Sequence, residues 1–124
     1  MSATRRQRRP LHRRGFIHLA HLPEVSEPKL VLIVSADLVT EHLRPIVVQV
    51  TSTARLRGLP TTVELRPGEG GVDYTSYVLC HQINALDSDT VDDDPIGPRL
   101  PDRRLVQVEE ALLRALDIDV DLAA

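Results

Sequence analysis

Five short apolar runs, separated by turns that contain proline or glycine, constrain the fold of this sequence more than any other feature. Each run has at most eight residues and is rich in valine, leucine and isoleucine, a pattern typical of β-strands. The run "LVLIVSA" is apolar almost throughout, as expected of a strand that is buried on both faces. We therefore predict five strands, at residues 16–22, 30–36, 46–50, 61–65 and 76–83.

One amphipathic helix is predicted near the end of the chain. Leu105, Val108 and Leu112 recur at intervals of three and four residues, and Ala115 with Leu116 continues the apolar stripe. Arginine and glutamate residues lie between these positions, as a helix on the surface requires. Short strands followed by one helix predict a mainly β fold, a small antiparallel barrel or half-open sheet with the helix packed on it.

Two aspartates are predicted to cap helices. Asp102 stands just before the amphipathic stripe, and Asp37 stands before a shorter helical turn over residues 38–43, which Pro45 ends. The segment 87–101, which leads to the long helix, is acidic and contains prolines. We predict that it is a connection without an element of its own.

The net charge of −3 conceals a strong polarity along the chain. Residues 1–14 carry six arginines and no acidic residue, whereas residues 87–124 carry four basic and eleven acidic residues. We interpret residues 1–12 as a basic, disordered arm and residues 13–124 as a single domain. The arm either neutralises the phosphates of a nucleic acid or acts only as a solubilising tail.

Composition excludes several classes of binding site. Phe16, Tyr74 and Tyr77 are the only aromatic residues, too few for rows of stacked bases or for a groove that binds proline-rich peptides. Cys80 is the single cysteine, which excludes an internal disulfide and a zinc site built from several cysteines. No apolar run approaches the roughly 20 residues that cross a bilayer, so we expect a cytoplasmic protein.

Five segments follow one another along the chain: "RRGFIHLAHL", "VLIVSAD", "VTSTARLRGLPTTVEL", "PGEGGVDYTSYVLCHQINALD" and "LPDRRLVQVEEALLRALDI". In this order and spacing they resemble the MazF/PemK family of toxins, over the range from Arg13 to Ile118. No single segment is specific, but the ordered set is. The resemblance implies an SH3-like small barrel of about five to seven strands with a C-terminal helix, a homodimer, and endoribonuclease activity.

The resemblance also implies two catalytic residues. Thr51 falls at the position of the family threonine that lies beside the scissile phosphate, at the end of the third strand. Its hydroxyl would donate a hydrogen bond to a phosphate oxygen that gains negative charge in the transition state. Lys29 stands where the family has an arginine that opens the second strand, and it keeps the charge but not the planar fork of donors.

Six further residues are candidates for RNA binding: Glu27, Ser52, Arg55, Arg57, His81 and Gln82. Arg55 and Arg57 would bind phosphates at the border of an RNA groove, or else they are solvated loop residues. Gln82 matches a glutamine of the family and would contact a base edge or a phosphate. His81 and Glu27 are the two candidates for the base that takes the proton of a ribose 2′-hydroxyl.

No metal or cofactor site is predicted. The histidines form no pair at helix spacing and have no cysteine companion, and residues 92–94, three aspartates, are more typical of a solvated loop than of a magnesium site. Because adjacent strand residues point to opposite faces, Cys80 and His81 are not expected to form a nucleophile pair. The same reasoning separates His18 from His21, three residues apart.

The first interpretation is a toxin-like endoribonuclease that cleaves single-stranded RNA without metal and leaves 2′,3′-cyclic phosphate and 5′-hydroxyl ends. The resemblance further implies a cognate antitoxin whose acidic tail lies in the RNA groove. The alternative is a MazF-like fold that has lost its chemistry and binds RNA or protein as a regulatory module. Lys29, the shortened loop before it, and Asn84 in place of a family arginine favour the alternative.

Overall fold

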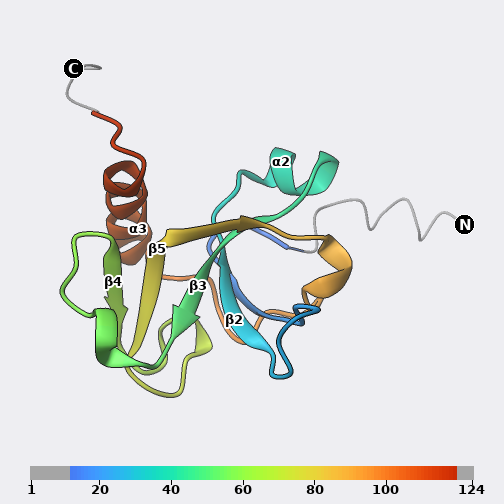
Figure 1. The fold of residues 1–124 in the computed structure, drawn as a ribbon, viewed down its shortest axis with the longest axis horizontal. Helices are drawn as coiled ribbons and strands as arrows, with labels where there is room; N and C mark the ends of the chain where they lie inside the picture. Colours follow the sequence, from blue (N-terminus) through green and yellow to red (C-terminus); the bar gives the residue numbers. More distant parts are fainter. Residues whose placement is uncertain (1–11, 120–124) are drawn as a thin grey trace, which may run out of the picture.

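The computed structural model describes residues 12–119, which form one curved sheet with a long helix beside it (Figure 1). Three short 3-10 helices, η1 to η3, lie in the connections. The elements are, in chain order, β1 (Ile17–Ala20), β2 (Lys29–Ile33), α2 (Asp37–His42), β3 (Ile46–Thr51), η1 (Ala54–Leu56), β4 (Thr62–Leu65), η2 (Glu69–Gly71), β5 (Ser76–Ala85), η3 (Ser88–Thr90) and α3 (Asp102–Ala115).

All five predicted strands are present, and every pairing in the sheet is antiparallel, in the order β1-β2-β3-β5-β4. The mainly β class with a C-terminal helix is therefore confirmed. The sheet is open rather than a closed barrel, since within the described residues its outer strands, β1 and β4, do not pair with each other. The curvature of a small barrel is nevertheless visible in the bent β5 (Figure 1).

The bend in β5 comes from an irregular register against β3. Gln49 of β3 pairs with Leu79, but the preceding residue, Val48, pairs with Ile83, so three residues of β5 have no partner on β3. Extra residues in one strand of a pair bend that strand and increase its twist. The first half of β5 consequently runs beside β4, and the second half turns across the start of β3 (Figure 1).

Apolar residues are buried on both faces of the sheet. The larger core lies under α3, which packs against β4 and β5 through Leu105, Val108 and Ala111. The predicted stripe was correct at Leu105, Val108 and the partly buried Leu112, and it also includes Ala111, which was not predicted. Leu116, predicted to be in the stripe, is 56% exposed because α3 ends before it.

The smaller core covers the opposite face. Buried residues in it or beside it come from two segments in which no element of the fold was predicted, the acidic connection and the basic arm. Val91 is 3% exposed and forms a bridge with Ala20, so part of segment 87–101 pairs with an edge strand instead of merely connecting elements. His12, which the sequence analysis places in the basic arm, is also only 3% exposed and lies against this segment. Residues 1–11, the rest of that arm, lie outside the described residues.

Neither predicted cap residue caps its helix. Both helices begin one residue early, so Asp37 and Asp102 are their first residues and neither cap position makes a side-chain hydrogen bond. The Asp37 carboxylate instead accepts a hydrogen bond from the backbone N–H of Arg14, and Asp102 pairs with Arg99. These carboxylates connect chain segments. Their negative charge also interacts favourably with the positive N-terminal end of each helix dipole.

Candidate functional site

Lys29 and Thr51 occupy neighbouring positions at one end of the sheet. Leu30–Val50 is the last pair of β2 and β3, and Lys29 and Thr51 are the next residues of these two strands. Residues that follow one pair in the same antiparallel register project to the same face of the sheet. The fold thus brings together the two residues to which the family resemblance assigns catalysis.

The Thr51 hydroxyl is partly exposed and is oriented by the chain that follows it. Its Oγ1 accepts a hydrogen bond from the backbone N–H of Thr53, at 3.1 Å. A hydroxyl has one proton to donate and two lone pairs, so this contact uses a lone pair and leaves the proton available. Thr51 can therefore donate a hydrogen bond to an anionic oxygen that approaches this end of the sheet.

Among the described residues, three of the five cationic side chains without a partner are predicted site residues; the other two are Arg66 and Arg114. Within residues 12–119, the side chains of Lys29, Arg55 and Arg57 make no ion pair or hydrogen bond. Six other arginines are committed to carboxylates, in the pairs Arg13–Asp37, Arg14–Glu109, Arg44–Asp87, Arg99–Asp102, Arg103–Glu69 and Arg104–Glu69. The exposed Arg55 lies in η1, which packs against β5, and Arg57 follows it.

His81 and Gln82 lie in the bend of β5, away from the Lys29–Thr51 pair. The residue of β5 opposite Thr51 is Tyr77, and four residues of strand, about 13 Å, separate Tyr77 from His81. His81 is exposed, and its Nδ1 lies 2.9 Å from the hydroxyl of Thr61. The structure therefore does not bring His81 to the Thr51 hydroxyl, and it leaves the exposed Gln82 at a second point along the sheet.

Glu27 and Ser52 flank the pair on either side. Glu27 is exposed in the loop between β1 and β2, two residues before Lys29 in the chain. Ser52 follows Thr51 but faces the α3 side, where it lines a cavity of about 420 Å³ together with Leu30, Tyr74 and Ser76. Lys29, Thr51 and Ser52 thus lie at one end of the sheet, with Ser52 on the face opposite Thr51.

Tyr74 is a site residue that the sequence analysis missed. It is 73% exposed and lines the cavity beside Ser52, so an aromatic ring stands at the border of the candidate site. The sequence analysis counted Tyr74 only as one of few aromatic residues. Its place just after the glycine-rich loop 67–71, outside any strand, was the one available signal that it faces solvent.

The structure also tests the expectations for Cys80, for the histidines and for the aspartates at 92–94. Cys80 is fully buried while His81 is exposed, so they do point to opposite faces, and burial raises the pKa of the Cys80 thiol to about 12. His18 is buried and His21 is exposed, as predicted. The aspartates at 92–94 are exposed, as predicted; in addition, the Asp92 carboxylate lies 2.8 Å from the ring of His21, and its carbonyl accepts a hydrogen bond from His18.

Comparison with protein families shows the family to which this fold belongs. Residues 13–116 match the family of PemK-like, MazF-like toxins of type II toxin-antitoxin systems. The chain belongs to this family. The recognised MazF-like region begins one residue after the buried His12 and includes Lys29, Thr51 and all the other candidate residues.

Solved structures of MazF toxins have the same fold. The Mycobacterium tuberculosis toxin MazF-mt6 is 29% identical, with a TM-score of 0.70 over 83% of this chain and 97% of that one. An endoribonuclease from mycobacterial species, in complex with its cognate antitoxin, is 28% identical, with a TM-score of 0.69 over 86% and 96%. MazF from Deinococcus radiodurans, at 19% identity, shares the fold with a TM-score of 0.69 over 86% and 96%. No curated protein matches the chain significantly.

Two further findings bear on the MazF-like chain. None of the helices formed by residues 12–119 is long and apolar enough to span a membrane. In the same part of the chain, no three histidine, cysteine, aspartate or glutamate side chains are grouped so that they could hold a metal ion.

Proposed function

We propose that this chain is a toxin that cleaves single-stranded RNA as a metal-independent endoribonuclease in the cytoplasm. The observation that carries the proposal is the position of Lys29 and Thr51, each one residue beyond Leu30–Val50, the last pair of β2 and β3, where Thr51 Oγ1 accepts a hydrogen bond and its own proton has no described acceptor. A cation and a hydroxyl on one face can together bind two oxygens of a phosphate. A structurally similar protein at 28% identity, the mycobacterial endoribonuclease, supports the same activity.

The proposed reaction is an internal transfer at the phosphate. The ribose 2′-oxygen attacks the adjacent phosphorus, the bond from phosphorus to the 5′-oxygen breaks, and a 2′,3′-cyclic phosphate and a 5′-hydroxyl result. Lys29 balances the charge on the phosphate, and Thr51 donates to the oxygen that becomes more negative in the transition state. Both effects act at the phosphorus, where no redox change or cofactor is needed.

The proton of the 2′-hydroxyl requires a base, and Glu27 suits this role better than His81. Glu27 lies two residues from Lys29 in the chain, whereas His81 lies about 13 Å along β5 from the residue opposite Thr51. A general base must come within hydrogen-bond reach of the proton that it removes. We therefore assign His81, with Gln82, to contacts with the RNA strand at some distance from the cut.

Arg55, Arg57 and Tyr74 would hold the RNA strand on both sides of the cut. The two unpaired arginines can bind phosphates, and their neutralisation releases counterions from the RNA. Tyr74, exposed beside Ser52, offers a ring on which one base can stack. The same unpaired cations would attract the acidic tail of an antitoxin, which would then compete directly with RNA. In a homodimer, one assembly would contain two such sites.

The test is cleavage of a long unstructured RNA by the purified full chain in EDTA, with Thr51→Ala as the companion variant. We expect discrete fragments whose 5′ ends accept phosphate from a polynucleotide kinase without prior phosphatase treatment, and no fragments with Thr51→Ala. Fragments that appear only after magnesium is added, or fragments unaffected by Thr51→Ala, would reject this mechanism.

A binding module without catalysis is the second candidate, and Lys29 is the observation that favours it. A lysine at the family arginine position provides one point charge instead of a planar fork that contacts two phosphate oxygens at once. This candidate predicts that the native chain binds RNA but does not cut it, and that Lys29→Arg restores cutting.

A further inference from the structure

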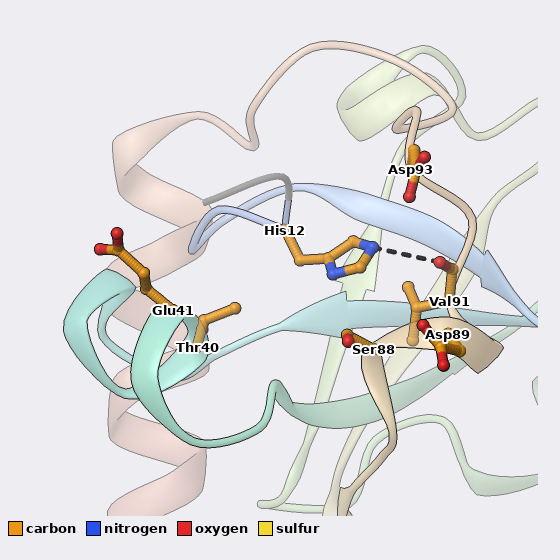
Figure 2. A pocket seen from close by; sticks show the side chains of 7 residues that line it. All are labelled: His12, Thr40, Glu41, Ser88, Asp89, Val91 and Asp93. Carbon is orange, nitrogen blue, oxygen red and sulfur yellow. Dashed lines mark hydrogen bonds between the residues drawn. The ribbon is translucent and has the colours of Figure 1, made fainter. Parts of the chain in front are cut away.

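A second cavity, of about 350 Å³, lies between α2 and the segment that follows β5, on the face of the sheet opposite α3 (Figure 2). Strand β2 runs from Lys29 at the candidate RNA site to Ile33 next to α2, so the cavity is at the other end of the sheet. Its polar lining comes from His12, from α2 and from the chain around η3. It shares no residue with the site of the proposed function.

His12 shows which kind of ligand this cavity suits. The ring is only 3% exposed, and its Nε2 lies 3.1 Å from the carbonyl oxygens of both Val91 and Asp92. Carbonyl oxygens only accept hydrogen bonds, so Nε2 carries the proton. In the neutral ring, Nδ1 then has a lone pair and is an acceptor. Figure 2 shows Nδ1 directed into the cavity on the side of Ser88, and no described residue donates a hydrogen bond to it.

The other polar groups of the cavity are also predominantly acceptors. The carboxylates of Asp89 and Asp93 line it and make no ion pair or hydrogen bond within the described residues. Glu41 lines it from α2, and its single recorded ion pair is with the adjacent, exposed His42 at 4.0 Å. One imidazole lone pair and three exposed carboxylates thus line the cavity, and this set of acceptors suits a ligand with positive charge and several N–H groups.

A metal ion does not meet this demand. No three of the histidine and acidic side chains described are close enough together to coordinate one ion, so the acceptors are spread over the cavity wall. An arginine guanidinium is planar, always charged, and presents five N–H donors and no acceptor. It can reach several separated acceptors at once, which a metal ion or a compact ammonium group cannot.

We propose that this cavity is a guanidinium-binding site and that its occupant is an arginine of the chain's own N-terminal segment, residues 1–11. That segment contains Arg5, Arg6, Arg8 and Arg9, and it leads directly into His12, which lines the cavity. Arg9 is three residues from His12, so their Cα atoms are at most about 11 Å apart. The basic segment and the acidic cavity are complementary in charge.

This assignment gives the basic segment a partner within the protein. Arginines engaged by Asp89 and Asp93 are not available to bind phosphates, so the segment would contribute to RNA binding only after leaving the cavity. The site therefore differs from the phosphate-binding arm expected from the sequence. It depends on neither RNA cleavage nor Lys29 and Thr51, and its test succeeds or fails independently of the proposed function.

The experiment uses the ¹⁵N-labelled full chain and a full-length variant in which Arg5, Arg6, Arg8 and Arg9 are replaced by glutamine. Both are titrated with N-acetyl-L-argininamide, and with N-acetyl-L-citrullinamide as the uncharged control, while the His12 ring signals are followed by NMR. We expect the variant to bind the arginine probe, with a shift of the His12 Nδ1 resonance, and the native chain to bind it at least about tenfold more weakly. The citrulline probe should not bind to either chain.

Two carboxylate variants complete the test. In the variant with four glutamines, called the neutral-arm chain, Asp89→Asn and Asp93→Asn should each weaken binding of the arginine probe about tenfold. Each substitution removes a charge-assisted hydrogen bond. Glu110→Gln, a matched loss of one exposed carboxylate on α3, should leave it unchanged. Failure of the neutral-arm variant to bind the probe overturns the site. Equal binding by the native and neutral-arm chains overturns the N-terminal segment as its occupant.

Discussion

The backbone N–H of Thr53 donates a hydrogen bond to Oγ1 of Thr51 at 3.1 Å, and this contact holds the hydroxyl at the end of β3 through one of its lone pairs. Thr51→Ser retains both the acceptor and the proton, so we expect cleavage of RNA within a few-fold of the native rate. Thr51→Val retains the shape and removes the donor, and we expect a loss of about 10²–10³-fold in single-turnover rate.

The matched control for Thr51 is Thr53→Val. This change removes an exposed hydroxyl two residues away but leaves the backbone N–H that orients Thr51. Its cleavage rate should be native. A Thr53→Val chain as slow as Thr51→Val would show that the hydroxyl at position 51 has no special role.

Arg55 and Arg57 are expected to contribute to RNA affinity through their charges alone. With both changed to glutamine, the slope of log affinity against log salt concentration should decrease by about 1.4, or 0.7 for each single-strand phosphate contact. Filter binding or fluorescence anisotropy with a short RNA in EDTA measures this slope. Arg114→Gln removes an equally exposed cation from α3 and should leave the slope unchanged.

Gly71 and Gly97 allow two chain segments to cross at van der Waals contact. A Cβ at Gly97 would lie 2.4 Å from Cα of Gly71, a backbone atom that cannot rotate away. Gly97→Ala should therefore lower the free energy of unfolding by about 1–3 kcal/mol, measured by urea denaturation. Gly68→Ala, where φ is +94° but nothing lies within 4 Å, tests backbone strain alone and should cost roughly 1 kcal/mol.

The stability of the protein should decline as the pH falls through the range where His18 titrates. Burial holds the pKa of His18 below its ordinary value of 6.5; the Asp92 carbonyl opposes this shift and the neighbouring His12 adds to it. His18 donates Nδ1–H to that carbonyl, and its Nε2 is buried without a partner. A second proton, on Nε2, would therefore have no hydrogen-bond acceptor.

The sign of this effect follows from the lowered pKa. The unfolded chain takes up a proton near pH 6.5 while the folded chain does not, so the contribution of His18 is complete above pH 6.5 and is lost as the pH falls through its folded pKa. Urea unfolding between pH 7.5 and pH 5 should show a decline of up to about 1.4 kcal/mol per pH unit from this group. In His18→Leu that part of the slope should be absent; parallel slopes in the two proteins would contradict the assignment.

Local sequence patterns predicted the elements of this fold well because the strands and α3 depend on local periodicity. All five strands appear within a few residues of their predicted positions, and the buried Leu105 and Val108 follow from helical spacing. The caps failed because Asp37 and Asp102 find partners outside the helix that each one begins. A pattern read along the chain carries no information about such partners.

The site was predictable only where the resemblance to a family provided a register. Lys29 and Thr51 were identified by their alignment with that family, and the sheet then explains why residues 22 positions apart meet. His12 shows the opposite case. The arginine content of residues 1–12 assigned His12 to a basic arm, but its hydrogen bond to Val91, 79 residues away, places it in the fold. The acceptor-lined cavity that results could not be predicted from either segment alone.

The most direct test of the account is the single-turnover cleavage rate of an unstructured RNA in EDTA by the native chain, Lys29→Arg and Lys29→Met. If Lys29 and Thr51 together stabilise the phosphate, the native chain cuts, Lys29→Arg cuts at least as fast, and Lys29→Met is slower by about 10²-fold or more. A Lys29→Met chain that cuts at the native rate, or a native chain that does not cut at all, would contradict the central claim.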